Sequence, residues 1–179
     1  MSRSRLARIL ILPLLLGCLL AVSGPAQAAP DVRVGFGGWG KIDFGIKLQR
    51  AARILDRKVY DGCGGKPAVY PSPRGLSISH PFARYGYSIK KMRVTYMGGY
   101  GSNIHGPHGI HPGMRLGRAL NLMGTDRHKL VGEYVTGWYE MGPRGKHALV
   151  IQGYEGKVSQ VAVVKSRKIA KRVATNPGC

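Results

Sequence analysis

Three histidines follow one another at intervals of three residues in a segment rich in glycine and proline. They are His105, His108 and His111. In a backbone with about three residues per turn, this spacing could place all three imidazoles on one side. Three histidines are a recognised ligand set for zinc or copper. The sequence therefore offers a metal site, and no other cofactor is expected. The competing interpretation is a solvated loop in which His111, before Pro112, helps to begin a helix.

The carboxylates of the chain offer little further chemistry. Among only 8 Asp and Glu residues, Glu133 and Glu140 are candidates for the paired carboxylates of a glycosidase. Seven residues apart in an alternating strand, however, they would point to opposite faces. The chain also lacks a Gly-x-Ser-x-Gly nucleophile motif and a phosphate-binding loop. The sequence thus predicts a protein that is not an enzyme, with a metal-binding protein or hydrolase built on the histidine cluster as the alternative.

Positive charge is the strongest functional feature of the chain. Its 28 Lys and Arg residues give a formal net charge of +20. The densest groups are Lys165, Arg167, Lys168, Lys171 and Arg172 near the C-terminus and Lys90, Lys91 and Arg93 on a predicted strand. An ordinary solvated face mixes charges of both signs. This one-sided excess predicts a surface that binds polyanions through electrostatic attraction and counterion release.

The first 28 residues have the pattern of a secretory signal peptide. Three arginines precede an apolar run over 9–22, and the small residues of Ala26-Gln27-Ala28 offer a cleavage site before Ala29. A lipid-modified Cys18 is the alternative, since 15–18 loosely resembles a lipobox. Cleavage removes three arginines and no acid, which leaves a formal charge of +17.

Export decides which partners the basic surface would meet. We expect a secreted, periplasmic or envelope protein without a transmembrane segment after cleavage near Ala28. Its partners would be an anionic envelope polymer, lipid headgroups or an acidic protein, whereas an exported protein rarely meets nucleic acid. Cleavage also leaves two cysteines, Cys63 and Cys179, which the oxidising compartment should join in a disulfide. Two free thiols are the alternative.

An internal repeat indicates how these residues are positioned. Segments 42–55 and 110–123 share the pattern Ile-x-x-Gly-apolar-basic-Leu-x-Arg-Ala at a constant offset of 68 residues. Each contains an apolar stripe at helical spacing, which begins at Leu48 in the first and at Leu116 in the second. We therefore predict two equivalent helices over these segments.

Strand-like alternation follows each predicted helix. The expected strands include 76–78, 85–89 and 92–96 in the first half and 133–141, 147–152 and 157–165 in the second. The second half carries a seven-residue insert over 102–108. The sequence predicts an α+β fold of two tandem repeats, each a short helix packed on a small antiparallel sheet. Their expected bounds are 29–100 and 101–179, after a signal peptide over 1–28.

A short helix that begins at a glycine, followed by a meander ending in a Gly-Lys-Val-x-x-Val strand, here Gly156 to Val161, resembles a known repeat. It is similar to the repeat of β-lactamase-inhibitor-protein-like domains and of the SmpA/OmlA envelope lipoproteins. The resemblance implies a binding or assembly role rather than catalysis, and it permits an inhibitor of a secreted enzyme. This chain departs from the family in its heavy positive charge and its seven-residue insert. The leading hypothesis is an exported, non-enzymatic binding protein.

Overall fold

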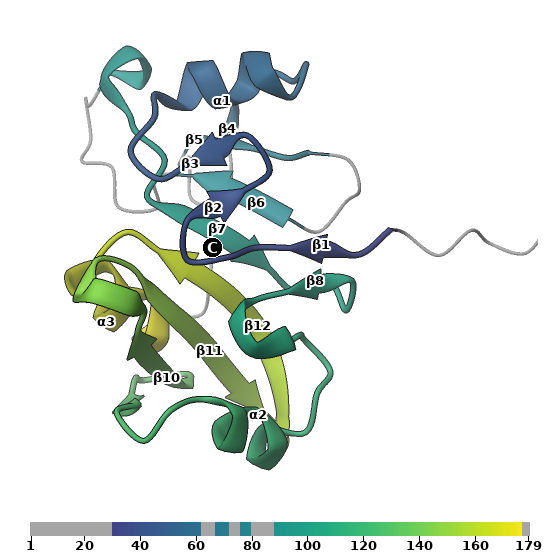
Figure 1. The fold of residues 1–179 in the computed structure, drawn as a ribbon, viewed down its shortest axis with the longest axis vertical. Coiled ribbons are helices and arrows are strands. Elements are labelled where there is room, and N and C mark those ends of the chain that lie inside the picture. Colours follow the sequence, from purple (N-terminus) through teal and green to yellow (C-terminus); the bar gives the residue numbers. More distant parts are fainter. Residues whose placement is uncertain (1–29, 62–66, 72–75, 80–87, 177–179) are drawn as a thin grey trace, which may run out of the picture.

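The computed structural model describes residues 30–61, 67–71, 76–79 and 88–176. Within them, eight strands form one antiparallel sheet in the order β4-β5-β6-β7-β12-β11-β10-β9 (Figure 1). The strands are β4 (Tyr60–Asp61), β5 (Pro67–Val69), β6 (Leu76–Ser79), β7 (Tyr96–Gly99), β9 (His128–Val131), β10 (Thr136–Met141), β11 (Ala148–Tyr154) and β12 (Lys157–Val164).

Helices cover both faces of this sheet. They are α1 (Leu48–Ile54), α2 (Leu116–Leu122) and α3 (Arg167–Thr175). Buried side chains of α1 and of α2 pack on the same face, α1 over β6 and β7 and α2 over β10 and β11. Helix α3 packs on the opposite face, over β10 to β12. The helices and the large antiparallel sheet confirm the predicted α+β class.

Short elements complete the side of the sheet that carries α1 and α2. Strand β1 (Val32–Arg33) pairs in parallel with β8 (Ile104–His105), and β2 (Gly38–Trp39) pairs antiparallel with β3 (Ile42–Asp43). Three single 3₁₀ turns lie among the described residues: η2 (Ile89–Lys91), η3 (Pro107–Gly109) and η4 (Pro143–Gly145). The buried side chains of β1, β3 and β8 join the core beneath α1. Within the described residues, no helix is both long and apolar enough to cross a membrane.

The two predicted helices form, but they are shorter than predicted. Helices α1 and α2 both begin at the Leu of the shared pattern, so the offset of 68 residues holds in the structure. The residues before them are not helical, because Gly45 and Gly113 have φ values of +91° and +87°. A left-handed residue ends a right-handed helical path, and glycine adopts it without steric cost. The apolar stripe is better buried in α1, where Leu48 is fully covered, than in α2, where Leu116 is half-buried.

The prediction of two separate small sheets is wrong, because the strands form one sheet. Strand β7 pairs antiparallel with β12, with Tyr96 opposite Val164 and Gly99 opposite Val161. The pairing places the last strand of the first half beside the last strand of the second. Of the predicted strand over 92–96, only Tyr96 belongs to a strand of the sheet. The strand predicted over 85–89 falls mostly outside the described residues, and the Cys63–Cys179 disulfide falls entirely outside them.

Candidate anion-binding surface

Lys165 lies at the junction of the two halves of the sheet, directly after β12. Its backbone N–H donates to the Thr95 carbonyl at 2.9 Å, which continues the pairing of β12 with the β7 side of the sheet. Its side chain reaches the turn at Gly45, where a Cβ atom added to the glycine would lie 3.1 Å from Lys165 Nζ. The left-handed conformation of Gly45 favours glycine there. The ammonium group therefore lies against a turn that has no side chain of its own.

Arg93 reaches the same turn from the segment that leads into β7. Its Nη1 atom donates to the Gly45 carbonyl at 2.8 Å. The backbone N–H of Gly45 donates in turn to the Val94 carbonyl at 2.8 Å, and Lys47 pairs with Arg93 in an antiparallel bridge. Basic residues from three separate segments of the chain therefore meet at one turn.

His147 lies beside this turn at the start of β11. Ala148 is opposite Val164 in the sheet, so the next residues outward, His147 and Lys165, are neighbours. The imidazole ring contacts the Phe44 ring, with centroids 4.8 Å apart. Burial lowers the pKa of His147, and the nearby positive charges of Lys165 and Lys146 lower it further, while a hydrogen bond with the Phe36 backbone acts in the opposite direction. Burial is therefore the main cause of the lowered pKa, and the two lysines add to it.

Helix α3 extends the positive surface away from Lys165. Ser166 caps the helix, since its hydroxyl accepts from the Ile169 N–H at 3.4 Å. The buried residues of α3 are Ala170, Val173 and Ala174. The exposed residues include Arg167, Lys168, Lys171 and Arg172, which the helical period of 3.6 residues places on the opposite side. All four are cations, so the solvent face of the helix carries charge of one sign.

The structure brings together the two basic groups that the sequence predicted separately. Lys165 and Arg93 both reach Gly45; along the chain, Lys90 and Lys91 precede Arg93, and the cations of α3 follow Lys165. Both lysines of η2 are exposed, and η2 packs against α1. Lys171 and Arg172 lie one helical turn after Arg167 and Lys168. The term "basic surface" below means the eight predicted cations together with Lys47, Lys146 and His147.

The ion pairs between described residues lie outside the basic surface. Both ion pairs seen within the described part of the chain involve histidines, His105 with Asp31 and His108 with Glu140. Lys146, Lys165 and Lys168 form no ion pair with any described carboxylate. Asp43, exposed and two residues before Gly45, is the carboxylate nearest to the turn in the sequence.

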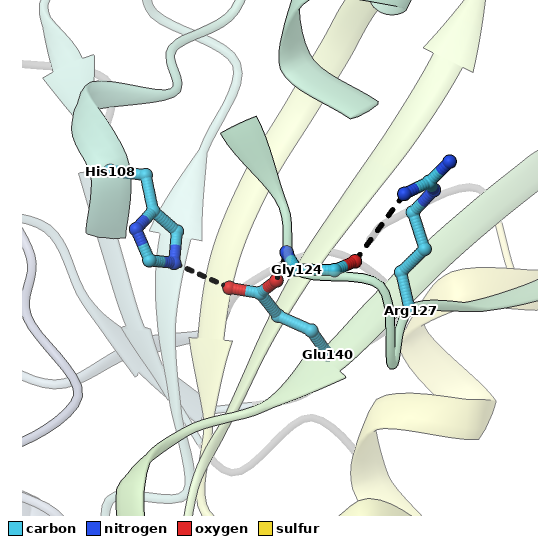
Figure 2. A network of polar contacts seen from close by, with 4 residues as sticks. All are labelled: His108, Gly124, Arg127 and Glu140. Carbon is cyan, nitrogen blue, oxygen red and sulfur yellow. Dashed lines mark hydrogen bonds and ion pairs between the residues drawn. The ribbon is translucent and has the colours of Figure 1, made fainter. Parts of the chain in front are cut away.

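A second polar cluster ties together three segments on the face of the sheet that carries α1 and α2, where the Phe36 ring also contacts His108 (Figure 2). The Glu140 side chain accepts from His108 Nε2 at 2.6 Å through Oε1 and from the Gly124 N–H at 2.6 Å through Oε2. The Gly124 carbonyl in turn accepts a hydrogen bond from Arg127 Nη1 at 3.4 Å. Glu140 is buried, next to Leu149 in the sheet, whereas the His108 side chain is 42% exposed. The carboxylate thus joins β10, the turn after α2 and the η3 turn.

The three histidines proposed as metal ligands are not brought together. His108 has a φ of +60°, which turns its ring toward Glu140 and the Phe36 ring. His105 and His111 remain neighbours, with ring centroids 5.0 Å apart, but His111 Nδ1 is bonded to the Pro112 carbonyl at 2.9 Å. Among the residues described, no three His, Cys, Asp or Glu side chains form a group that could hold a metal ion.

The proposed pair of carboxylates is also separated. Glu133 is exposed in the turn before β10, while Glu140 is buried within that strand. The strand begins at Thr136 rather than at Glu133, because residues 132–135 form the turn between β9 and β10. Glu140 therefore acts as an acceptor for His108 and Gly124 and has no carboxylate partner among these two candidates.

Comparison with known proteins does not place the chain in a family. No protein-family model and no curated protein matches it. Among solved structures, it is similar to the crystal structure of the uncharacterized protein yfeY from Escherichia coli, with 14% sequence identity and a TM-score of 0.44. The match covers 74% of this chain and 99% of that one. At this level of similarity, neither the fold nor the function of that protein can be assigned to this chain.

Proposed function

We propose that this chain is an exported, non-enzymatic binding protein that attaches through its basic surface to an anionic polymer of the cell envelope. The observation that carries the proposal is the meeting of Lys165 and Arg93 at Gly45, which joins two basic groups separated in the sequence by about the length of one repeat. A linear polyanion needs a continuous row of cations rather than one pocket. Lys165 and Arg93 at Gly45, with the exposed lysines of η2 before β7 and the exposed cations of α3 after β12, supply several cations for such a chain.

The energetics favour attachment by charge. A polymer that neutralises several cations releases its condensed counterions, so affinity rises steeply as salt is lowered. The same positive field draws an anionic partner to the surface and speeds its association. The same positive potential would also attract anionic lipid headgroups and acidic proteins, which are the competing partners in the test below.

We also propose that the fold arose as two tandem repeats, with approximate bounds 29–100 and 101–179. Support comes from α1 and α2, which keep the sequence offset of 68 residues and pack on the same face of the sheet. In each half, four strands follow the helix in antiparallel order. The basic surface would then lie where the two repeats join, and α3 would be an addition to the second.

The salt dependence of polyphosphate binding tests the proposed function. Log K should fall linearly with log salt concentration, and replacing Lys168 and Lys171 by Gln should reduce the slope by up to about two, roughly one per lost contact. Thermal stability should change little, since exposed charges contribute little to folding. Titrations by fluorescence anisotropy over a series of salt concentrations provide the measurement.

A matched control removes the same charge elsewhere. Arg118 on α2 and Lys157 at the start of β12 are exposed and lie at the opposite end of β12 from Lys165. Replacing both by Gln should leave the salt slope close to that of the parent. If both double variants reduce the slope of log K against log salt concentration equally, the basic surface has no special role and only net charge matters. Stronger binding of polyglutamate or of anionic vesicles than of polyphosphate would shift the assignment to a different partner.

A further inference from the structure

The side chains around Gly45 form a compact group within the basic surface. His147 and Lys165 are neighbours across the sheet, and Lys165 Nζ lies against Gly45. The Phe44 ring covers one side of the His147 ring at a centroid distance of 4.8 Å. The Phe36 backbone is hydrogen-bonded to the same imidazole, so its orientation is fixed from two sides.

We propose that Phe44, Lys146, His147 and Lys165 form a subsite for one phosphate group of the bound polymer, and that filling this subsite is coupled to uptake of a proton by His147. This inference rests on the proposed function and specifies the ligand class and its pH dependence. The subsite would bind one repeating unit, while the cations of α3 and η2 follow the polymer on either side.

The charges that face His147 explain the coupling. Lys165 after β12 and Lys146 before β11 are the positive groups that hold its pKa below the ordinary value, in addition to burial. Arg93 adds a third cation at Gly45 and Asp43 is the carboxylate two residues before that glycine. Buried Glu140 lies two residues before Gly142, whose N–H donates to the His147 carbonyl. A bound oxyanion offsets the repulsion from the lysines, which favours the protonated imidazole. The imidazolium then adds its own charge to the attraction.

The arrangement of donors favours phosphate over carboxylate. The ammonium and imidazole groups approach Gly45 from the ends of two strands, while Phe44 lies between the Gly45 turn and His147. A tetrahedral phosphate presents oxygens in several directions, whereas a carboxylate presents two in one plane. Lysine also binds phosphate well as a point charge and does not need a planar partner. The ligand group that this subsite would bind is therefore an exposed phosphate oxygen of a phosphodiester or a phosphoanhydride.

Polyphosphate binding measured against pH tests the inference, because the internal phosphates of this polymer keep their charge near neutral pH. Affinity at fixed salt should rise as the pH falls through the range in which His147 takes up its proton, by up to about tenfold per pH unit where a single proton is taken up on binding. Replacing His147 by Gln should remove this dependence. NMR titration of the His147 ring should show its pKa increase when polyphosphate is added.

Replacement of His128 by Gln is the matched control. This exposed histidine lies on the edge strand β9 and stacks on Tyr139, so its loss should leave the pH dependence unchanged. If the parent binds but the H147Q variant keeps the same pH dependence, the subsite is wrong while the proposed function stands. An equal pH effect with polyglutamate would overturn the assignment to phosphate. If the parent shows no salt-dependent binding at any pH, both the function and the subsite are wrong.

Discussion

Replacing His108 by Ala should lower the free energy of unfolding by about 1.5 to 3 kcal/mol, the range for a hydrogen bond to a charged group, because it leaves a buried carboxylate with one donor fewer. Glu140 is only 6% exposed and accepts one bond each from His108 and from the Gly124 N–H. An ionised carboxylate can only accept, so His108 donates this bond. Without it, water must enter to replace the lost donor. Urea denaturation near neutral pH provides the measurement.

Two further variants distinguish loss of the His108–Glu140 hydrogen bond from simple loss of side-chain packing. Replacing His105 by Ala removes an imidazole from the same segment, where its contact with Asp31 is 3.5 Å long and partly exposed. That change should cost less than about 1 kcal/mol. Replacing His108 by Ala and Glu140 by Leu together should recover much of the loss, since no charge then remains buried. Equal costs for H108A and H105A would show that the bond to Glu140 contributes nothing.

Replacing Leu48 by Ala should cost about 2 to 5 kcal/mol, the range for a fully buried leucine in a core that relaxes only partly. Leu48 is 0% exposed and packs beneath α1 with Ile78 and Met97. Its backbone N–H also bonds to the Met92 carbonyl at 2.9 Å, which holds the side chain in place. Thermal and urea denaturation of the variant provide the measurement.

The corresponding change at Leu116 is the natural comparison. Leu116 begins α2 at the equivalent position of the sequence pattern, but it is half-buried and lies at the margin of its cluster. Its replacement by Ala should therefore cost less than that of Leu48, because fewer of its contacts are lost from a closed core. A cost below about 1 kcal/mol at Leu48 would contradict the packing described for α1.

Local patterns predicted the parts of the fold that depend on neighbouring residues. The apolar spacing after Gly45 and Gly113 located helices within 42–55 and 110–123, and alternation located β11 and β12 to within about two residues. The same patterns overextended both helices. Whether a glycine begins a helix or occupies a left-handed turn before it depends on φ, which the residue type alone does not determine.

Contacts between distant segments could not be predicted in this way. The pairing of β7 with β12 joins residues more than 60 positions apart, and it brings Lys165 close to Gly45 and Arg93. The sequence indicated two basic groups without indicating that they touch. His147 was missed for the same reason, because its partners Phe44 and Lys165 come from other segments.

Glu140 did leave a signal in the sequence. It stands between aromatic and apolar residues, Tyr139 and Met141, in a chain with only 8 acids. Strand alternation places it on the same face as Trp138. Trp138 is buried, so the Glu140 carboxylate is covered too and needs hydrogen-bond donors. His108 was considered only as a metal ligand, and its left-handed backbone, which directs it to Glu140, is visible only in the structure.

A map of backbone amide shifts during titration with polyphosphate tests the central claim most directly, because it locates the bound polymer on the chain. The account predicts the largest changes in the heteronuclear NMR spectrum at Gly45, His147, Lys165 and the first turn of α3. Residues at the opposite end of β12, such as Lys157, and on α2, such as Arg118, should shift little. Equal shifts at both ends of β12, or the largest shifts around α2, would show that the polymer does not bind the basic surface.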